Sequence, residues 1–351
     1  MKVGIATVQV PFITGGAEAL AQSLWKELRL RGYESEIFAI PFKWYPAETL
    51  LHCMIMGRLM DLTEVNGYAI DVLVGLKFPA YYTRHDRKVI WLLHQHRQAY
   101  DLWGTEFGDM HAWPDSERLR RAIHEHDIRY MSEAKRIFTI AQKVTGRVNK
   151  YTGLTATTLY HPPPSHELLH CETFDPFVFY PSRIDKMKRQ RLLVEAARHL
   201  KSEMKIVIAG SGVPTEIDYL QTLIREHNLE SRVRLAGFIS DEEKRTLYAQ
   251  CRCTFFGGYD EDYGYIPLES FYSRKPAIVL DDSGGGLEFI EEGRNGYVVP
   301  NDPVQLAAKI DQLGFDRDLA ERLGDRGFAV MHEKEISWDH VISSLLGAAG
   351  V

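Results

Sequence analysis

The chain has 351 residues and a formal net charge of −6, with 45% hydrophobic and 26% charged residues. These fractions are ordinary for globular proteins and exclude disordered, collagen-like and coiled-coil chains. Single cores stop growing at roughly 250–300 residues, so we expect two domains. The acidic balance argues against a nucleic-acid-binding protein, and no nucleic-acid partner is expected.

The cysteine pattern indicates a reducing compartment. Four cysteines in a chain of this length form neither a disulfide framework nor a zinc-binding spacing. The amino-terminal residues lack the features of a cleavable signal, and no stretch approaches the ~18 apolar residues of a spanning helix. We therefore expect a cytoplasmic protein with free thiols.

The first half of the sequence alternates strand and helix patterns. A strand is expected over residues 2–10, and a helix follows over 17–30 with leucines spaced along one face and Gly32 as its stop. Further strands are expected at 35–40, 71–76, 88–93 and 136–141. Each is short and almost continuously apolar, as in a parallel sheet covered on both faces.

The second half repeats this alternation. Strands are expected at 176–182, 205–210, 232–237, 253–258, 276–282 and 296–300, with helices at 190–200, 216–227 and 266–273. Ser240 and Glu243 have capping-box spacing, and Asp302 followed by Pro303 is typical of a helix start. Trp338, Val341 and Leu345 lie along one face of a last helix.

Two such blocks predict two doubly wound α/β domains. Three consecutive prolines at 162–164 resist both helix and central strand, so they indicate the linker. The expected domains are residues 1–165 and 166–335, followed by a helix at about 336–351. Residues up to 166 carry 20 basic and 17 acidic side chains, which leaves most of the negative charge in the second domain.

Four loops that follow expected strands contain glycine. They hold Gly15 and Gly16, then Gly210, Ser211 and Gly212, then Gly264, and finally the glycines at 284–286. Glycine lets a backbone approach a phosphate closely, and a helix N-terminus supplies free N–H groups. Ordinary turn formation is the alternative for any one loop. The absence of the G-x-x-x-x-G-K-[ST] pattern excludes a P-loop nucleoside triphosphatase.

The segment 260–269, DEDYGYIPLE, carries the most specific pattern. Glu261 and Glu269 are eight positions apart, on the expected loop and one turn into the next helix. Carboxylates at such positions can accept hydrogen bonds from vicinal hydroxyls, as on a ribose or a hexose. Asp260 and Asp262 have the D-x-D spacing of a metal motif, but no further ligands accompany them, so no metal site is expected.

The E-x-Y-G-x-x-P-x-E spacing resembles the E-x(7)-E motif of retaining nucleotide-sugar glycosyltransferases of family 4, which have the GT-B fold. SRIDKMK resembles the family's G-R-x-x-x-x-K segment, and GGAEAL, IAGSG, VRLAGFI and DSGGGLEFIEEGRNGYVV follow the family's order. The resemblance implies two Rossmann-like domains facing a central cleft, with the last helix crossing back to the first domain.

In this family the second domain binds the donor. The resemblance implies that Arg183 and Lys188 bind its diphosphate, that Glu269 holds the ribose and that Glu261 holds the hexose. Other donor contacts implied by position come from the backbones of Gly210, Ser211, Gly212, Phe238, Ile239, Gly264, Tyr265 and Ile266. For the cations the alternative is a solvated basic stretch, and for Glu269 it is an acidic residue favoured by the helix dipole.

In the first domain, the resemblance implies that His94 lies near the reacting sugar, with His96 as the competing histidine. Gly15 and Gly16 would pack against the diphosphate. Two departures from the family pattern are Ser182 and Arg189, which stand where glycines are usual, and Tyr263 replaces the usual phenylalanine.

The resemblance implies metal-independent transfer of a hexosyl group, with retained configuration, from a nucleoside diphosphate sugar to a hydroxyl. A UDP-sugar is favoured over a GDP-sugar. The acceptor is a saccharide, a lipid-linked saccharide or a small molecule, and the setting is surface polysaccharide or glycoconjugate synthesis. The basic segment RLRRAIHEHDIRY could hold the first domain at the inner membrane face, although a solvated helix explains it as well. The alternatives are a nucleotide-sugar epimerase and a non-catalytic sugar-nucleotide-binding scaffold.

Overall fold

The computed structural model describes residues 1–12 and 15–351. By their internal contacts these residues form two units, Met1–Pro164 with Ser337–Val351, and Ser165–Ile336. The chain leaves the first unit directly after the three consecutive prolines, and the unit boundaries lie within one residue of the expected ones.

The first unit is a parallel sheet of six strands in the order β2-β1-β5-β6-β7-β8. The strands are β1 Lys2–Gln9, β2 Glu34–Pro41, β5 Val72–Gly75, β6 Lys88–Leu92, β7 Arg136–Thr139 and β8 Thr157–Thr158. A short antiparallel hairpin, β3 Glu64–Val65 and β4 Tyr68–Ala69, lies outside this sheet. The order changes direction between β1 and β5, as in flavodoxin-like folds.

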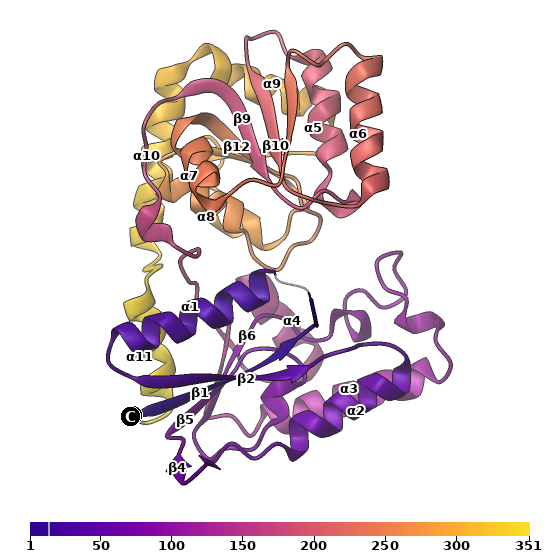
Figure 1. The fold of residues 1–351 in the computed structure, drawn as a ribbon, viewed down its shortest axis with the longest axis vertical. Helices are drawn as coiled ribbons and strands as arrows, with labels where there is room; N and C mark the ends of the chain where they lie inside the picture. The colour runs from indigo at the N-terminus through magenta and orange to yellow at the C-terminus, as the bar shows by residue number, and fades with distance from the viewer. Residues whose placement is uncertain (13–14) are drawn as a thin grey trace. The chain divides into compact units, whose positions relative to one another are not determined.

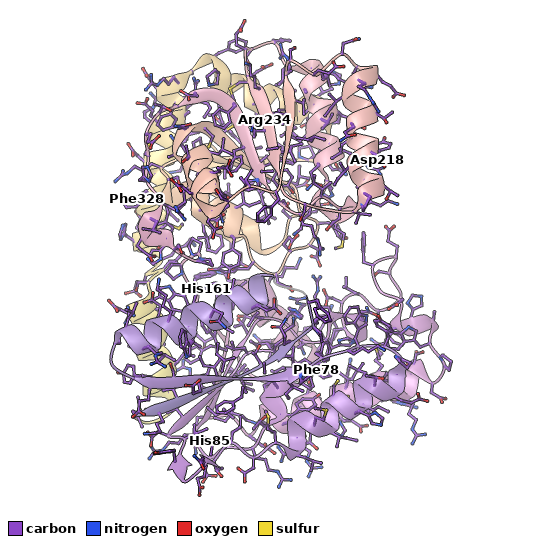
Figure 2. All side chains as sticks on the ribbon, viewed as in Figure 1. Phe78, His85, His161, Asp218, Arg234 and Phe328 are labelled. Atoms are coloured by element: carbon purple, nitrogen blue, oxygen red, sulfur yellow. The ribbon has the colours of Figure 1, made fainter. Side chains whose placement is uncertain are left out.

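Helices cover both faces of the first sheet (Figure 1). They are α1 Gly16–Leu30, α2 Ala47–Leu59, α3 Ser116–Met131, α4 Gln142–Thr152 and α11 Trp338–Ala348. Helix α11 docks through Trp338, whose ring packs on Trp91 of β6 and on His161, which Figure 2 labels. The expected apolar face of the last helix is confirmed, since Trp338, Val341 and Leu345 are buried.

The second unit is also a parallel sheet of six strands, in the order β11-β10-β9-β12-β13-β14. The strands are β9 Asp175–Pro181, β10 Lys205–Ala209, β11 Val233–Gly237, β12 Cys251–Phe256, β13 Ala277–Leu280 and β14 Gly296–Val299. This is the dinucleotide-binding order 3-2-1-4-5-6, in which direction changes between the first and fourth strands. The switch point of the second sheet therefore lies between β9 and β12.

The second sheet also has helices on both faces, with α5 and α6 on the side away from α7 and α8 (Figure 1). The helices are α5 Gln190–Ala196, α6 Pro214–Glu226, α7 Asp241–Gln250, α8 Tyr265–Tyr272, α9 Pro303–Phe315 and α10 Arg317–Glu333. The Ser240–Glu243 capping box opens α7, and Asp302 caps α9, both as predicted. The two doubly wound α/β units confirm the predicted fold class.

Candidate functional site

The strongest candidate site lies at the switch point of the second sheet. Strands β9 and β12 are hydrogen-bonded neighbours, and the loops after them lead to helices on opposite faces. Ligands of open α/β sheets bind beyond the carboxyl ends of strands at such a point. The loop after β9 carries Arg183 and Lys188, and the loop after β12 carries Glu261.

Lys188 and Glu261 form an ion pair across this switch point, in which the Lys188 ammonium donates to Oε1 of the carboxylate. Their side chains are 22% and 24% exposed, so the pair is shielded yet reachable from solvent. The hydroxyl of Tyr180, at the end of β9, donates to the carbonyl oxygen of Lys188 at 2.5 Å. Tyr180 is fully buried, and the pattern of the sequence did not single it out.

Asp185 organises the turn between the two cations. Its Oδ1 accepts hydrogen bonds from the backbone N–H groups of Met187 and Lys188, at 2.9 and 3.2 Å. Its Oδ2 accepts from Arg183 Nε at 3.0 Å. The Arg183 side chain is 69% exposed, and Asp185 holds it at the surface of the loop. Two cations on one short loop suit an anionic group that approaches from solvent.

Arg189 explains why this loop tolerates the loss of a glycine. Its φ of 54° lies in the left-handed region that glycine adopts most readily. The side chain forms a two-point ion pair with Asp282, with both N–O distances at 2.6 Å, and its guanidinium lies over the Tyr259 ring. These contacts offset the backbone strain.

The glycines of two loops make close approaches to neighbouring backbone. A Cβ at Gly210 would lie 2.3 Å from the carbonyl oxygen of Ser182, and one at Gly212 would lie 2.2 Å from that of Ile184. A Cβ at Gly284 would lie 2.3 Å from the carbonyl oxygen of Glu261. These glycines allow loops to pack around the cation and carboxylate pair. Ser211 is exposed and its carbonyl accepts from the Ile184 N–H at 3.0 Å.

Glu269 lies in α8 and is 6% exposed. Lys244 of α7 donates to its Oε1 at 2.8 Å, and Tyr248 of α7 donates to its Oε2 at 2.6 Å. Burial opposes the charge of Lys244, but the carboxylate outweighs it and raises the lysine pKa. Burial foremost, and then the same carboxylate, raise the pKa of the Tyr248 hydroxyl. Both partners were missed by sequence analysis, because nothing in the sequence links α7 to α8.

The start of α8 lies next to Glu261, as predicted. Gly264 is the N-cap residue, and Tyr265 and Ile266 form the first turn. A Cβ at Gly264 would lie 2.5 Å from the Cα of Gly286, so this position also needs glycine for packing. Tyr263 keeps the packing expected of the usual phenylalanine, with edge contacts to Tyr265 and Phe289.

Phe238 and Ile239 follow β11 and lead into α7. Phe238 is 84% exposed, whereas Ile239 packs against the buried cluster that contains Phe179 and Tyr248. Their backbone therefore lies at the carboxyl edge of the second sheet, on the other side of the switch point from β12, with β10 and β9 between β11 and β12.

The first unit holds the other predicted residues at the carboxyl edge of its own sheet. His94 follows β6, is half-buried and contacts the carbonyl oxygen of Gln95 through Nδ1 at 2.6 Å. The competing His96 is buried with its ring against that of Phe78, and burial foremost lowers its pKa to about 3. Gly15 caps α1, and its N–H donates to Glu18 Oε2 at 2.8 Å; Gly16 is the first helical residue.

Neither a metal-binding cluster nor a membrane-spanning helix is found within residues 1–12 and 15–351. No group of three or more His, Cys, Asp or Glu side chains in these residues is arranged to hold a metal ion. None of the helices in the same residues has the length and apolarity that crossing a membrane requires.

Comparison with known proteins shows a family match in the second unit. Residues 171–330, within the second unit, match the family described as glycosyl transferases group 1. The alpha-1,3/1,6-mannosyltransferase ALG2 of Dictyostelium discoideum is 29% identical over 140 residues, 38% of this chain and 33% of that protein. The N-acetylgalactosamine-N,N′-diacetylbacillosaminyl-diphospho-undecaprenol 4-alpha-N-acetylgalactosaminyltransferase of Campylobacter jejuni is 33% identical over 128 residues, 36% and 34% of the two chains. The matches span about a third to a half of the length of such curated relatives.

Solved structures resemble the whole chain. A sucrose-phosphate synthase from Thermosynechococcus elongatus has a TM-score of 0.75 at 17% identity, covering 98% of this chain and 97% of its own. HepE of Anabaena, solved in complex with UDP-glucose, has a TM-score of 0.70 at 15% identity, covering 100% and 99%. The chain therefore has the GT-B fold, and residues 171–330 of its second unit match the group 1 glycosyltransferase family. Both conclusions confirm the predicted resemblance; membership of family 4 and retention of configuration stay predictions.

Proposed function

We propose that the chain is a retaining glycosyltransferase that moves a hexosyl group from a nucleoside diphosphate sugar, with UDP-sugars favoured, to a hydroxyl. The observation that carries this proposal is the Lys188–Glu261 ion pair at the switch point of the second sheet. It joins the two predicted donor motifs in one place, beside the positive N-terminal end of α8. The relatives named above are sugar transferases, and HepE was solved with UDP-glucose, which supports the same class of donor.

In the proposed reaction, Arg183 and Lys188 bind the donor diphosphate and stabilise the negative charge that grows on it. Glu261 accepts hydrogen bonds from hexose hydroxyls through the oxygen that Lys188 does not occupy, and Glu269 accepts them from the ribose. The bond between the sugar C1 and the diphosphate oxygen breaks. The acceptor oxygen bonds to C1 on the same face, and the acceptor proton passes to the departing diphosphate. No protein base is needed in this scheme.

The first unit binds the acceptor in this proposal, which is a saccharide, a lipid-linked saccharide or a small molecule of glycoconjugate synthesis. His94 contacts the donor sugar, and Gly15 and Gly16 border the diphosphate. The setting is the cytoplasm, with peripheral contact at the inner membrane face through basic α3. Fractionation of cells that express the protein tests this setting, since recovery outside the cytoplasmic and membrane-bound fractions contradicts it.

The deciding experiment follows donor turnover and product stereochemistry. UDP-sugars and GDP-sugars are incubated with a panel of acceptors, and released nucleotide and the anomeric proton couplings of the product are measured. Retention of the donor configuration is expected, with activity that survives EDTA. Inversion contradicts the retaining mechanism. If EDTA abolishes activity and added metal restores it, the reaction needs a metal, and Asp260 and Asp262 become its candidate ligands. Interconversion of the donor sugar without an acceptor would instead indicate an epimerase, and binding without turnover a scaffold.

A further inference from the structure

Helix α7 holds both oxygens of the Glu269 carboxylate. Lys244 and Tyr248 lie four residues apart, on one face of the helix. The Lys244 ammonium binds one oxygen at 2.8 Å, and the Tyr248 hydroxyl binds the other at 2.6 Å. A single carboxylate on α8 is thus clamped by two side chains from a different helix.

The clamp is rigid at its tyrosine end. Tyr248 is fully buried, and its ring makes an edge contact with Phe179 of β9 at a centroid distance of 5.0 Å. Lys244 is more accessible, with a side chain that is 31% exposed. The Glu269 side chain, at 8%, is the most enclosed member of the ion pair. A buried carboxylate needs such partners, because an uncompensated charge in that position is strongly destabilising.

The carboxylate keeps acceptor capacity beyond these two contacts. Two carboxylate oxygens offer about four lone-pair sites, and Lys244 and Tyr248 occupy one site on each oxygen. The remaining sites suit a pair of neighbouring hydroxyl donors, such as the 2′- and 3′-hydroxyls of a ribose.

The same helix connects Glu269 to the expected base-binding segment. Ile239 and Leu247 pack against the buried cluster that contains Tyr248, and Ile239 directly precedes the capping box of α7. The tyrosine that orients the carboxylate is therefore packed together with the backbone proposed to border the base. Helix α7 therefore positions both the carboxylate proposed to bind the ribose and the backbone proposed to border the base.

We propose that Lys244 and Tyr248 are positioning residues of the donor site, which orient Glu269 toward the two ribose hydroxyls and thereby set a preference for ribonucleotides over 2′-deoxyribonucleotides. This inference rests on the proposed function. A tyrosine or lysine with a purely structural role would alter the affinity for both nucleotides equally, so the ratio of the two affinities separates the two roles.

The test measures binding of UDP and 2′-deoxy-UDP to the full chain by calorimetry, with GDP and 2′-deoxy-GDP used if the wild type binds GDP. The wild type is expected to bind the ribonucleotide about tenfold more tightly or better. Tyr248→Phe removes one hydroxyl and should weaken UDP about tenfold, with little effect on 2′-deoxy-UDP. Lys244→Met should act likewise, and Lys244→Arg should restore most of the preference.

Matched controls are available in the same unit. Tyr272→Phe also removes a single hydroxyl, which donates to the carbonyl oxygen of Ile336 at 3.1 Å, and it should leave the preference unchanged. Lys309→Met removes an ammonium 4.0 Å from Glu292 and serves the same purpose. Melting temperatures of all variants verify folding, and Tyr248→Phe decides the question if Lys244→Met does not fold.

The outcomes are distinct. An unchanged preference in Tyr248→Phe, or equal losses for both nucleotides, would overturn the inference while leaving the proposed donor site intact. A wild type that binds none of these nucleotides would overturn the proposed function and this inference with it. Loss of preference in Tyr248→Phe with normal melting behaviour supports it.

Discussion

Lys188 and Glu261 are 73 positions apart in the sequence, and their side chains form an ion pair where the second sheet changes direction. The pair exists because β9 and β12 are neighbours, although three helices and two strands separate them along the chain. Each residue belongs to a different motif. Because the two residues meet at the carboxyl edge of the sheet, the two motifs form one site.

The ion pair predicts that Lys188→Ala lowers donor turnover by more than ~100-fold, because the growing charge on the diphosphate loses a fixed cation. The measurement is nucleotide release from the donor sugar that the wild type consumes. Lys186→Ala is the control, since this exposed lysine lies two residues away in the same turn. A turnover within a few-fold of the wild type for both variants would contradict the role of Lys188.

The glycine at position 284 is expected to be required by both conformation and space. Its φ is +73°, and a Cβ would lie 2.3 Å from the Glu261 carbonyl oxygen. Gly293 has a similar φ of +69°, with nothing within 4 Å of a Cβ. Gly284→Ala should therefore destabilise the protein by about 1–3 kcal/mol more than Gly293→Ala, as for overpacking. Equal urea midpoints for the two variants would show that the loop accommodates the methyl group.

Two substitutions of Arg189 separate the effect of backbone strain on stability from the effect of the side-chain contacts. Both Arg189→Ala and Arg189→Gly lose the ion pair with Asp282, but only glycine relaxes the positive φ of 54°. The glycine variant should be about 1 kcal/mol more stable than the alanine variant in chemical denaturation. The opposite order would mean that the backbone changes conformation once the guanidinium is removed.

Asp127 of α3 gives the first unit a pH-dependent stability. It is fully buried, and burial raises its pKa to about 6 despite hydrogen bonds from Tyr100, Tyr82 and Tyr81. The folded protein then holds a proton that the unfolded chain releases near pH 4. The stability from this proton is complete below about pH 4 and is lost as the pH rises through about 6.

Asp127→Asn removes this titration. The free energy of unfolding of the wild type, measured relative to the variant, should fall by up to about 3 kcal/mol between pH 4 and pH 7. Chemical denaturation of both proteins at several pH values measures this difference in the free energy of unfolding. A difference that stays constant, or that grows with pH, would contradict the raised pKa.

Local patterns predicted most of the fold. Periodicity located the two series of strands and helices, and capping chemistry located the starts of α7 and α9. The β3–β4 hairpin was missed, although Asn66 followed by Gly67 is a strong signal for its turn. Strand order was not predictable in detail, because it depends on packing between segments that are distant in sequence.

The candidate site was predicted in part for the same reason. The motifs identified Lys188, Glu261 and Glu269. Lys188 belongs to a motif on a single loop, and Glu261 and Glu269 belong to a motif that spans one loop and the helix after it. Lys244 and Tyr248 contact Glu269 only through the packing of α7 beside α8, and a single sequence carries no sign of that contact. The sequence likewise showed an arginine where glycine is usual, but it did not show that Arg189 adopts a left-handed backbone conformation.

The most direct test of the donor site is a thermal-shift panel with UDP, GDP, ADP and TDP on the wild type and on Glu269→Ala. A nucleotide at 100 times its dissociation constant stabilises the native state by about 2.7 kcal/mol, which gives a clear rise in melting temperature. The proposed site predicts a rise with one nucleotide, UDP in the favoured case, and a much smaller one in the variant. No rise with any of the four, or an equal rise in Glu269→Ala, would contradict the assignment of this switch point as the donor site.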